Sequence, residues 1–179
     1  MIPLDQLYVP SPIRRFSNLH LDDAVSSRPV PQRVRVPHSA LDTNRQECAV
    51  SFMSDGALGV SVRDVLKGCA RMQEGDSIVL ENTSVRMFRL SLEWPGYASS
   101  GKYIKVQENG TYITRRELAR AICERVKIFM AQAASSSDAM WIIPRSSDNP
   151  RISTNNLWLT RVAPAAHRGS WIAQLELAL

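Results

Sequence analysis

Two adjacent arginines, Arg115 and Arg116, occupy the position in this sequence that most clearly suits binding chemistry. They follow Thr114 in the run Thr-Arg-Arg-Glu, in which Thr114 and Glu117 have the spacing of a helix capping box. The N-terminus of a helix attracts anions, and two guanidinium groups beside it would strengthen that attraction. The arrangement therefore predicts either an anion site or two solvated residues in a first helical turn.

All four tryptophans lie in the second half of the chain. Tryptophan joins a large apolar area to one hydrogen-bond donor. It can fill a core between sheet and helix, or line a ligand groove or partner surface, where tryptophan and arginine often dominate the binding energy. Together with nearby polar residues, they give the candidate binding residues Trp94, Tyr97, Arg115, Arg116, Trp158, His167, Arg168 and Trp171.

The residues needed for common enzyme chemistry are not arranged in familiar patterns. The histidines His20, His38 and His167 form no pair with metal-binding spacing. The sequence contains no G-x-S-x-G, P-loop or G-x-G-x-x-G motif. Adjacent acids such as Asp22 and Asp23 make a poor acid–base pair. We therefore predict no catalytic residue, metal or cofactor, and we favour a protein that is not an enzyme.

The composition is that of a globular chain. Of 179 residues, 44% are hydrophobic and 22% are charged. No apolar run approaches the roughly 20 residues of a membrane helix, and the N-terminus does not have the pattern of a signal peptide. The widely spaced Cys48, Cys69 and Cys123 predict reduced thiols, hence a cytoplasmic or nuclear protein without membrane attachment. Cys69 and Cys123 fall on expected apolar helical faces.

The net charge of +5 is unevenly distributed. Residues 100–134 carry seven basic and three acidic side chains, whereas residues 46–99 carry five and seven. Eighteen of the 22 basic residues are arginine, which binds phosphate or carboxylate in a bidentate fork. The basic residues do not form a cluster with interleaved aromatic residues. Nucleic-acid binding through the basic stretch 102–127 is therefore disfavoured, although it remains an alternative.

Proline separates an N-terminal segment from the rest. Six of the ten prolines lie within residues 1–40, and proline interrupts both helices and central strands. Many apolar residues also lie there, so we expect residues 1–44 to form an extended arm that is either packed on the domain or a partner, or flexible. Residues 45–179 are expected to form a single domain.

Hydrophobic periodicity predicts the elements of that domain. Ser61 and Gly75 suggest the limits of a first helix, at about 61–74, and the capping box begins a second one, at about 115–133. Alternation of apolar and polar residues predicts strands. The expected strands are 48–53, 88–94, 102–107, 140–143, 157–159 and 171–179. This order predicts an α+β fold with a mostly antiparallel sheet.

The chain ends within the last of these strands. Trp171, Ala173, Leu175, Leu177 and Leu179 alternate onto one face. We expect this strand to belong to the sheet, and to be able to pair with its copy across a two-fold axis.

Three short motifs follow one another in the second half of the chain. They are W-P-G-Y at 94–97, I-T-R-R-E-L-A at 113–119 and, after the strand at 157–159, G-S-W at 169–171. In this order they resemble a family of uncharacterised proteins of basidiomycete, mushroom-forming fungi. The resemblance covers about residues 85–179 and implies a fungal source and a shared fold unit, without an established activity. Members often continue G-S-W with Gln and His, where this chain has Ile172 and Ala173.

These observations favour a non-enzymatic intracellular module that binds a protein partner or assembles with itself through tryptophan and arginine side chains. One alternative is a small-molecule-binding protein or enzyme with an enclosed apolar pocket between helix and sheet. A pocket that holds Tyr97, His167 and an acid together would favour this alternative. The other is the nucleic-acid binder described above.

Overall fold

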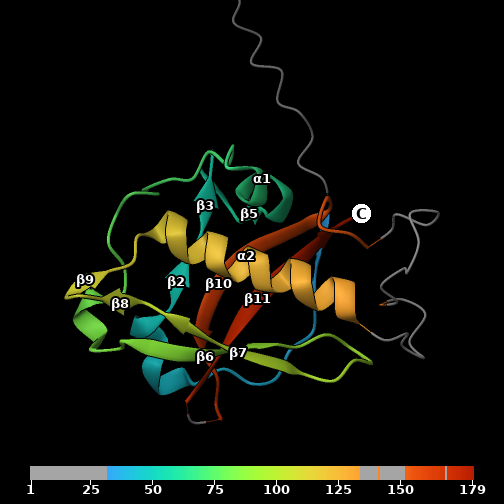
Figure 1. Ribbon diagram of the computed structural model, residues 1–179. Helices are drawn as coiled ribbons and strands as arrows, with labels where there is room; N and C mark the ends of the chain where they lie inside the picture. Colours follow the sequence, from blue (N-terminus) through green and yellow to red (C-terminus); the bar gives the residue numbers. More distant parts are fainter. Residues whose placement is uncertain (1–31, 134–140, 142–151, 168) are drawn as a thin grey trace, which may run out of the picture. The chain divides into compact units, whose positions relative to one another are not determined.

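The computed structural model describes residues 32–133, 141, 152–167 and 169–179. They form helices and a mostly antiparallel mixed sheet, which confirms the predicted α+β class (Figure 1). The strand expected at 140–143 lies outside the described residues, apart from Trp141, and so do residues 1–31 of the proline-rich segment.

The sheet is built around two long strands near the C-terminus, β10 and β11, which pair antiparallel. The spatial order is β2-β10-β11-β6-β7, with β5 also on β10 and β1 also on β11. Strand β6 runs parallel to β11, and the other pairs are antiparallel. The strands are β1 (Arg33–Arg35), β2 (Val50–Ser51), β5 (Val60–Ser61), β6 (Met87–Leu92), β7 (Ser100–Lys105), β10 (Leu157–Pro164) and β11 (Ser170–Ala178).

Strand β11 lies in the interior of the sheet. One of its edges pairs with β10, and the opposite edge pairs with β6 near Trp171 and with β1 near Leu177. The amide of Val36 donates to the carbonyl of Leu175 between these two partners. The expectation that β11 could pair with a second copy is therefore wrong, because both of its edges are already occupied by this chain.

Part of the expected N-terminal arm belongs to this folded unit. Strand β1 pairs with β11, Val36 is buried, and Leu41 forms a bridge with Ala165. His38 contacts the side chain of Gln174, which points to the face of β11 opposite to Leu175. Residues 36–49, with the short 3₁₀ helix η1 (Thr43–Cys48), therefore cover one face of the sheet.

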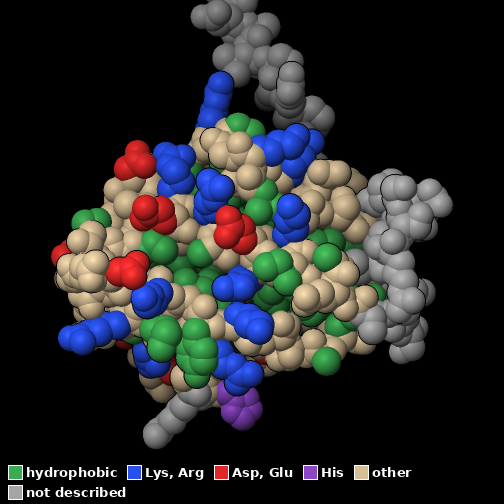
Figure 2. Space-filling model, in the orientation of Figure 1, with side chains coloured by type: hydrophobic (Ala, Val, Ile, Leu, Met, Phe, Trp, Pro, Cys, Tyr) green, Lys and Arg blue, Asp and Glu red, His purple; other side chains and the backbone are tan. Residues whose placement is uncertain are grey.

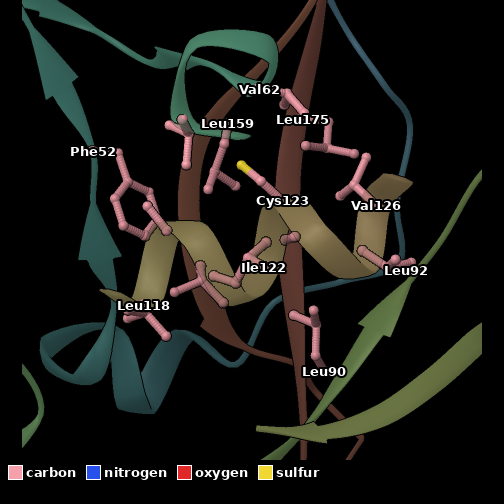
Figure 3. Packing of buried hydrophobic residues seen from close by; sticks show 14 of the residues in the cluster. Phe52, Val62, Leu90, Leu92, Leu118, Ile122, Cys123, Val126, Leu159 and Leu175 are labelled. Carbon is pink, nitrogen blue, oxygen red and sulfur yellow. The ribbon is translucent and has the colours of Figure 1, made fainter. Parts of the chain in front are cut away.

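Helix α2 (Arg115–Gln132) covers the other face of the sheet (Figure 1). The predicted capping box is present: Thr114 Oγ1 accepts from the Glu117 amide at 3.3 Å, and the Glu117 carboxylate accepts from the Thr114 amide at 2.9 Å. Figure 3 shows Leu118 and Ile122 on the side of the helix toward Leu90, and Cys123 toward Val62 and Leu159. The predicted apolar face of this helix thus forms the centre of the core.

Helix α1 (Val62–Lys67) is shorter than expected. Ser61 caps it as predicted, but Gly68 ends it in the left-handed conformation, with φ of +73°. The Gly68 amide donates to the carbonyls of Asp64 and Val65, an arrangement typical of glycine at a helix C-terminus. The expected end at Gly75 is therefore wrong. Cys69 consequently lies exposed in a loop instead of in the core.

The remaining elements are short. The strand expected at 48–53 is divided between the end of η1, β2 and β3. Asp55-Gly56 and Asn109-Gly110 form two-residue hairpin turns with positive φ at both positions. These turns join β3 (Met53–Ser54) to β4 (Ala57–Leu58) and β8 (Gln107–Glu108) to β9 (Thr111–Tyr112), and η2 spans Glu81–Thr83.

Candidate binding surface

The two arginines at the start of α2 bind groups of the protein itself. Arg115 Nη1 donates to the carbonyl of Ser51 at 2.6 Å, and Nη2 lies 3.3 Å from Glu74 Oε2. Its side chain is only 20% exposed. Arg116 Nε lies 3.1 Å from Asp76 Oδ1 and is about half exposed. Arg115 therefore neither forms an open anion site nor lies solvated in the first turn, the two possibilities expected from the sequence. Its side chain joins the helix to β2 and to the loop before β6.

The backbone amides of this helix turn are also in use. The Arg115 amide donates to the Ser77 carbonyl at 2.9 Å, and the Arg116 amide donates to the Gly75 carbonyl at 2.8 Å. Gly75 has no side chain, and a Cβ there would lie 2.6 Å from Arg116 Nη2. The first turn of α2 is therefore an anchor for residues 74–77, which supports a structural role for both arginines.

Three of the tryptophans are buried. Trp94 is 4% exposed, and its Nε1 donates to the Trp141 carbonyl at 2.8 Å. Trp171 is 2% exposed and stacks on Phe88 with ring centres 4.6 Å apart. Trp94, Trp141 and Trp171 therefore belong to the core, which corrects the expectation that Trp94 and Trp171 contribute to a binding surface.

Trp158 is partly buried beneath a cation. The guanidinium carbon of Arg33 lies 3.5 Å from the ring centre, and Arg33 Nη1 donates to the Leu58 carbonyl at 2.8 Å. Burial lowers the pKa of Arg33, while the charge of Glu176 opposes that change. This contact joins β1 to β10 and to the β3–β4 hairpin, so Trp158 is in use within the fold.

The other sequence candidates lie apart. Tyr97 is partly buried and meets the Phe129 ring at 6.3 Å, edge to face. His167 is exposed in the turn before β11, where its carbonyl accepts from Ser170 Oγ at 3.0 Å. Arg168 lies outside the described residues.

The grooves found among the described residues do not bring Tyr97 and His167 together. A groove of about 150 Å³ between α1 and α2 has the apolar residues Val65 and Met72 as its floor and Arg116 and Arg120 at its rim. A second groove, of about 410 Å³, lies on the other side of Arg116. The two arginines at the rim of the first groove are already paired within the protein, Arg116 with Asp76 at 3.1 Å and Arg120 with Glu124 at 3.2 Å.

The hairpin β6–β7 has the most distinctive exposed surface. Phe88, Leu90 and Leu92 alternate toward the core as predicted. The opposite face of the hairpin presents Met87 and Arg89 from β6 and Tyr103 and Lys105 from β7, with Tyr103 opposite Arg89 and Lys105 opposite Met87. Tyr103 is 63% exposed and Met87 is 54% exposed. Figure 2 shows hydrophobic side chains among Lys and Arg in the region where Figure 1 places this hairpin.

One flank of α2 continues this surface beyond the edge of β7. Figure 3 shows Leu118 on the side of α2 that faces Leu90 of β6. Ala121, Arg125 and Ile128 follow Leu118 at helical spacing and so continue this side of the helix. Ile128 is 44% exposed and Arg125 is partly buried. We name the combined set the β7 surface, and it consists of Met87, Arg89, Lys102, Tyr103, Lys105, Ala121, Arg125 and Ile128.

The charge of the β7 surface has one sign. Neither residues 86–92 nor residues 100–105 include an acidic side chain. Lys105 pairs with Glu108 at 3.0 Å, whereas no ion pair between described residues includes Arg89, Lys102 or Arg125. These cations are therefore available to a ligand without the loss of an existing ion pair.

Sequence reasoning did not single out Met87 and Tyr103. The available signal was phase: within the alternation of Phe88, Leu90 and Leu92, Met87 is an apolar residue on the polar side of the strand. In β7, likewise, the aromatic Tyr103 is exposed while its neighbour Ile104 is buried. A single apolar residue on the exposed face of a strand is common, but several of them gathered on one face form a patch that is typical of interaction sites.

Besides Arg33, two titratable groups have pKa values displaced by the fold. Hydrogen bonds from the backbone and side chain of Thr114 lower the pKa of Glu117. Burial, helped by the charge of Glu124, raises the pKa of Cys123 to about 12. In the part of the chain that the structure describes, His, Cys, Asp and Glu do not form a group able to hold a metal ion. None of the described helices combines the length and apolarity required to span a membrane.

Comparison with protein-family models, with curated proteins and with solved structures finds no match to this chain. The resemblance to basidiomycete proteins therefore stays a prediction.

Proposed function

We propose that this protein is a non-enzymatic binding module and that its partner is another protein, bound at the β7 surface. The observation that carries the proposal is the exposure of Tyr103 and Met87 at diagonal positions on one face of a hairpin whose two strands carry several basic residues and no acid. Large exposed apolar side chains beside arginine are typical of sites that dominate protein–protein binding. The proposed binding site therefore consists of residues of β6, β7 and the flank of α2 instead of the tryptophans expected from the sequence.

A single-stranded nucleic acid is the second candidate. An exposed aromatic ring among basic residues can stack a base while the cations meet phosphates. Tyr103 with Arg89 and Lys102 supports this reading. A protein partner is favoured because Met87 and Ile128 add aliphatic area that offers nucleic acid no matching contact.

The cysteines indicate the cellular compartment in which such a module would work. Cys48, Cys69 and Cys123 are all unpaired, and none forms a disulfide with another. Unpaired thiols suit a reducing compartment. We accordingly place the protein in the cytoplasm or nucleus as part of this proposal.

The test is selection of binders from a random peptide library displayed on phage, with the full-length protein immobilised. Peptides selected on the wild-type protein should bind the Leu58→Ser variant equally well, because Leu58 is an exposed hydrophobic residue on a different hairpin. They should lose binding to Tyr103→Ser. Equal binding to both variants would exclude the β7 surface. Salt-sensitive binding of oligothymidylate in competition with the peptides would favour the nucleic-acid alternative.

A further inference from the structure

We infer that the partner contributes an extended acidic segment, which adds to the free edge of β7 as a further strand. This inference rests on the proposed function and names the chemistry of the partner. It depends on three features of the described residues: the unpaired edge, the two walls beside it and the sign of the charge.

The first feature is a row of backbone groups on β7. The Val106 amide donates to the Arg86 carbonyl at 2.9 Å, so the amide of Val106 points toward β6. Hydrogen-bonded pairs alternate in an antiparallel ladder, so Ile104 and Lys102 also bond to β6. The backbone groups of Tyr103 and Gly101 then point away from β6, as do those of Lys105. No described strand pairs with β7 on that side.

The second feature is the pair of walls that an added strand would meet. Successive side chains of a strand point to opposite faces. One set of the partner's side chains would face Arg125 and Ile128 on the flank of α2, together with Lys102. The other set would lie beside Tyr103. The walls therefore favour a segment in which apolar and acidic residues alternate.

The third feature decides which strand can occupy the edge. Exposed lysines on an edge strand oppose pairing with another copy of the same strand. Two β7 strands in one antiparallel seam would add the lysines of both copies, Lys102 on one face and Lys105 on the other, to a surface that is already basic, and like charges close together on a strand pair are destabilising. An acidic strand meets the same lysines favourably. A purely protective role for the lysines would not require Tyr103 and Met87 to be exposed.

The probes for this inference are short fluorescent peptides. One alternates glutamate with valine, a second replaces each glutamate by lysine, and a third is the glutamate peptide with every backbone amide methylated. We expect the full-length protein to bind the first and to bind the other two at least about tenfold more weakly, since methylation removes the ladder donors. Lys102→Glu should weaken binding of the first peptide by about the same factor. The matched control Lys67→Glu, an exposed charge on α1, should not.

Amide hydrogen exchange identifies the mode of binding without any variant. The amides of Gly101, Tyr103 and Lys105 should exchange more slowly when the glutamate peptide is bound, while those of Lys102 and Ile104 change little. Peptide binding that leaves the Tyr103 and Lys105 amides unprotected would overturn strand addition, yet the proposed function would stand if the display-selected peptides still required Tyr103. Equal binding of the lysine peptide would overturn the acidic partner. A wild-type dimer that Tyr103→Ser dissociates would assign the edge to a second copy.

Discussion

Tyr103 of β7 lies directly opposite Arg89 of β6, on the face of the hairpin turned away from α2. The guanidinium of Arg89 lies over the neighbouring Gly101, where a Cβ would clash with its Nε. The absence of a side chain at Gly101 therefore lets the Arg89 side chain extend across β7. A basic and an aromatic residue thus occupy opposite positions of the ladder beside an open edge of the sheet, and this arrangement supports the proposed binding role.

The register of the hairpin predicts that substitutions of neighbouring residues change the free energy of unfolding by very different amounts. Ile104→Ala should lower the free energy of unfolding by about 2–5 kcal/mol, because Ile104 is buried. Tyr103→Ser should change it by less than about 0.5 kcal/mol, because this side chain faces solvent. Denaturant unfolding of both variants measures the difference. Comparable losses would show that Tyr103 belongs to the core and would remove the basis of the proposed site.

The two arginines of α2 should also differ in their contribution to stability. Arg115→Ala removes a largely buried guanidinium that donates to the Ser51 carbonyl and should cost about 2 kcal/mol. Arg116→Ala breaks an exposed ion pair with Asp76 and should cost less than about 1 kcal/mol. Thermal unfolding followed by circular dichroism compares them. If Arg116 proved the more important residue, the anchoring role of Arg115 would be contradicted.

The capping box should make stability depend on pH in the acid range. Hydrogen bonds from Thr114 hold the pKa of Glu117 below its ordinary value, so the folded state favours the ionised carboxylate. This contribution is complete above the pKa of the unfolded chain and is lost as pH falls through the lower, folded value. Glu117→Gln should therefore be less stable than wild type at neutral pH, and the difference should vanish in acid. A difference that does not depend on pH would argue against an ionised cap.

Thiol reactivity should distinguish the three cysteines. Cys69 is exposed, whereas Cys48 and Cys123 are buried, and burial raises the pKa of Cys123 to about 12. Because the thiolate is the reactive form, Ellman's reagent should modify one cysteine rapidly in the native protein and all three after denaturation. Cys69→Ser should abolish the rapid phase. A rapid phase that persists in this variant would mean that one of the other two cysteines is accessible.

Local signals in the sequence located several elements well. The Thr114–Glu117 pair predicted the start of α2, because a capping box is complete within four residues. Alternation of Phe88, Leu90 and Leu92 predicted β6. The Trp94–Tyr97 turn also follows from local chemistry, since Pro95 precedes Gly96, whose φ is +79°. Each of these features depends on neighbours in sequence.

Structural features that depend on contacts between distant segments of the chain could not be predicted from local sequence patterns. The parallel pairing of β6 with β11 and the pairing of β1 with β11 bring together segments far apart in the chain. The burial of Trp94 and Trp171 depends on the same pairings, since tryptophan suits a core and a surface equally well. The sequence pattern predicts the end of the first helix at Gly75, whereas the helix ends at Gly68 and α2 forms tertiary hydrogen bonds with residues 75–77.

The candidate site depends partly on local sequence patterns and partly on contacts between distant segments. Alternation along β6 and β7 was sufficient to place Met87 and Tyr103 on one outward face. The exposure of the β7 edge, however, depends on the order of strands in the sheet. The position of Arg125 beside that edge depends on how α2 crosses the sheet, which periodicity alone does not determine.

Charge reversal on the protein, measured against peptides of either charge, tests most directly whether the β7 surface binds an acidic partner. A Lys102→Glu, Arg125→Glu variant reverses two unpaired cations of the β7 surface without touching the core. Wild-type protein should prefer the alternating glutamate–valine peptide, and the variant should lose that preference and gain affinity for the lysine–valine peptide, as measured by fluorescence anisotropy. If both proteins bind both peptides with the same preference, the β7 surface is not the binding site.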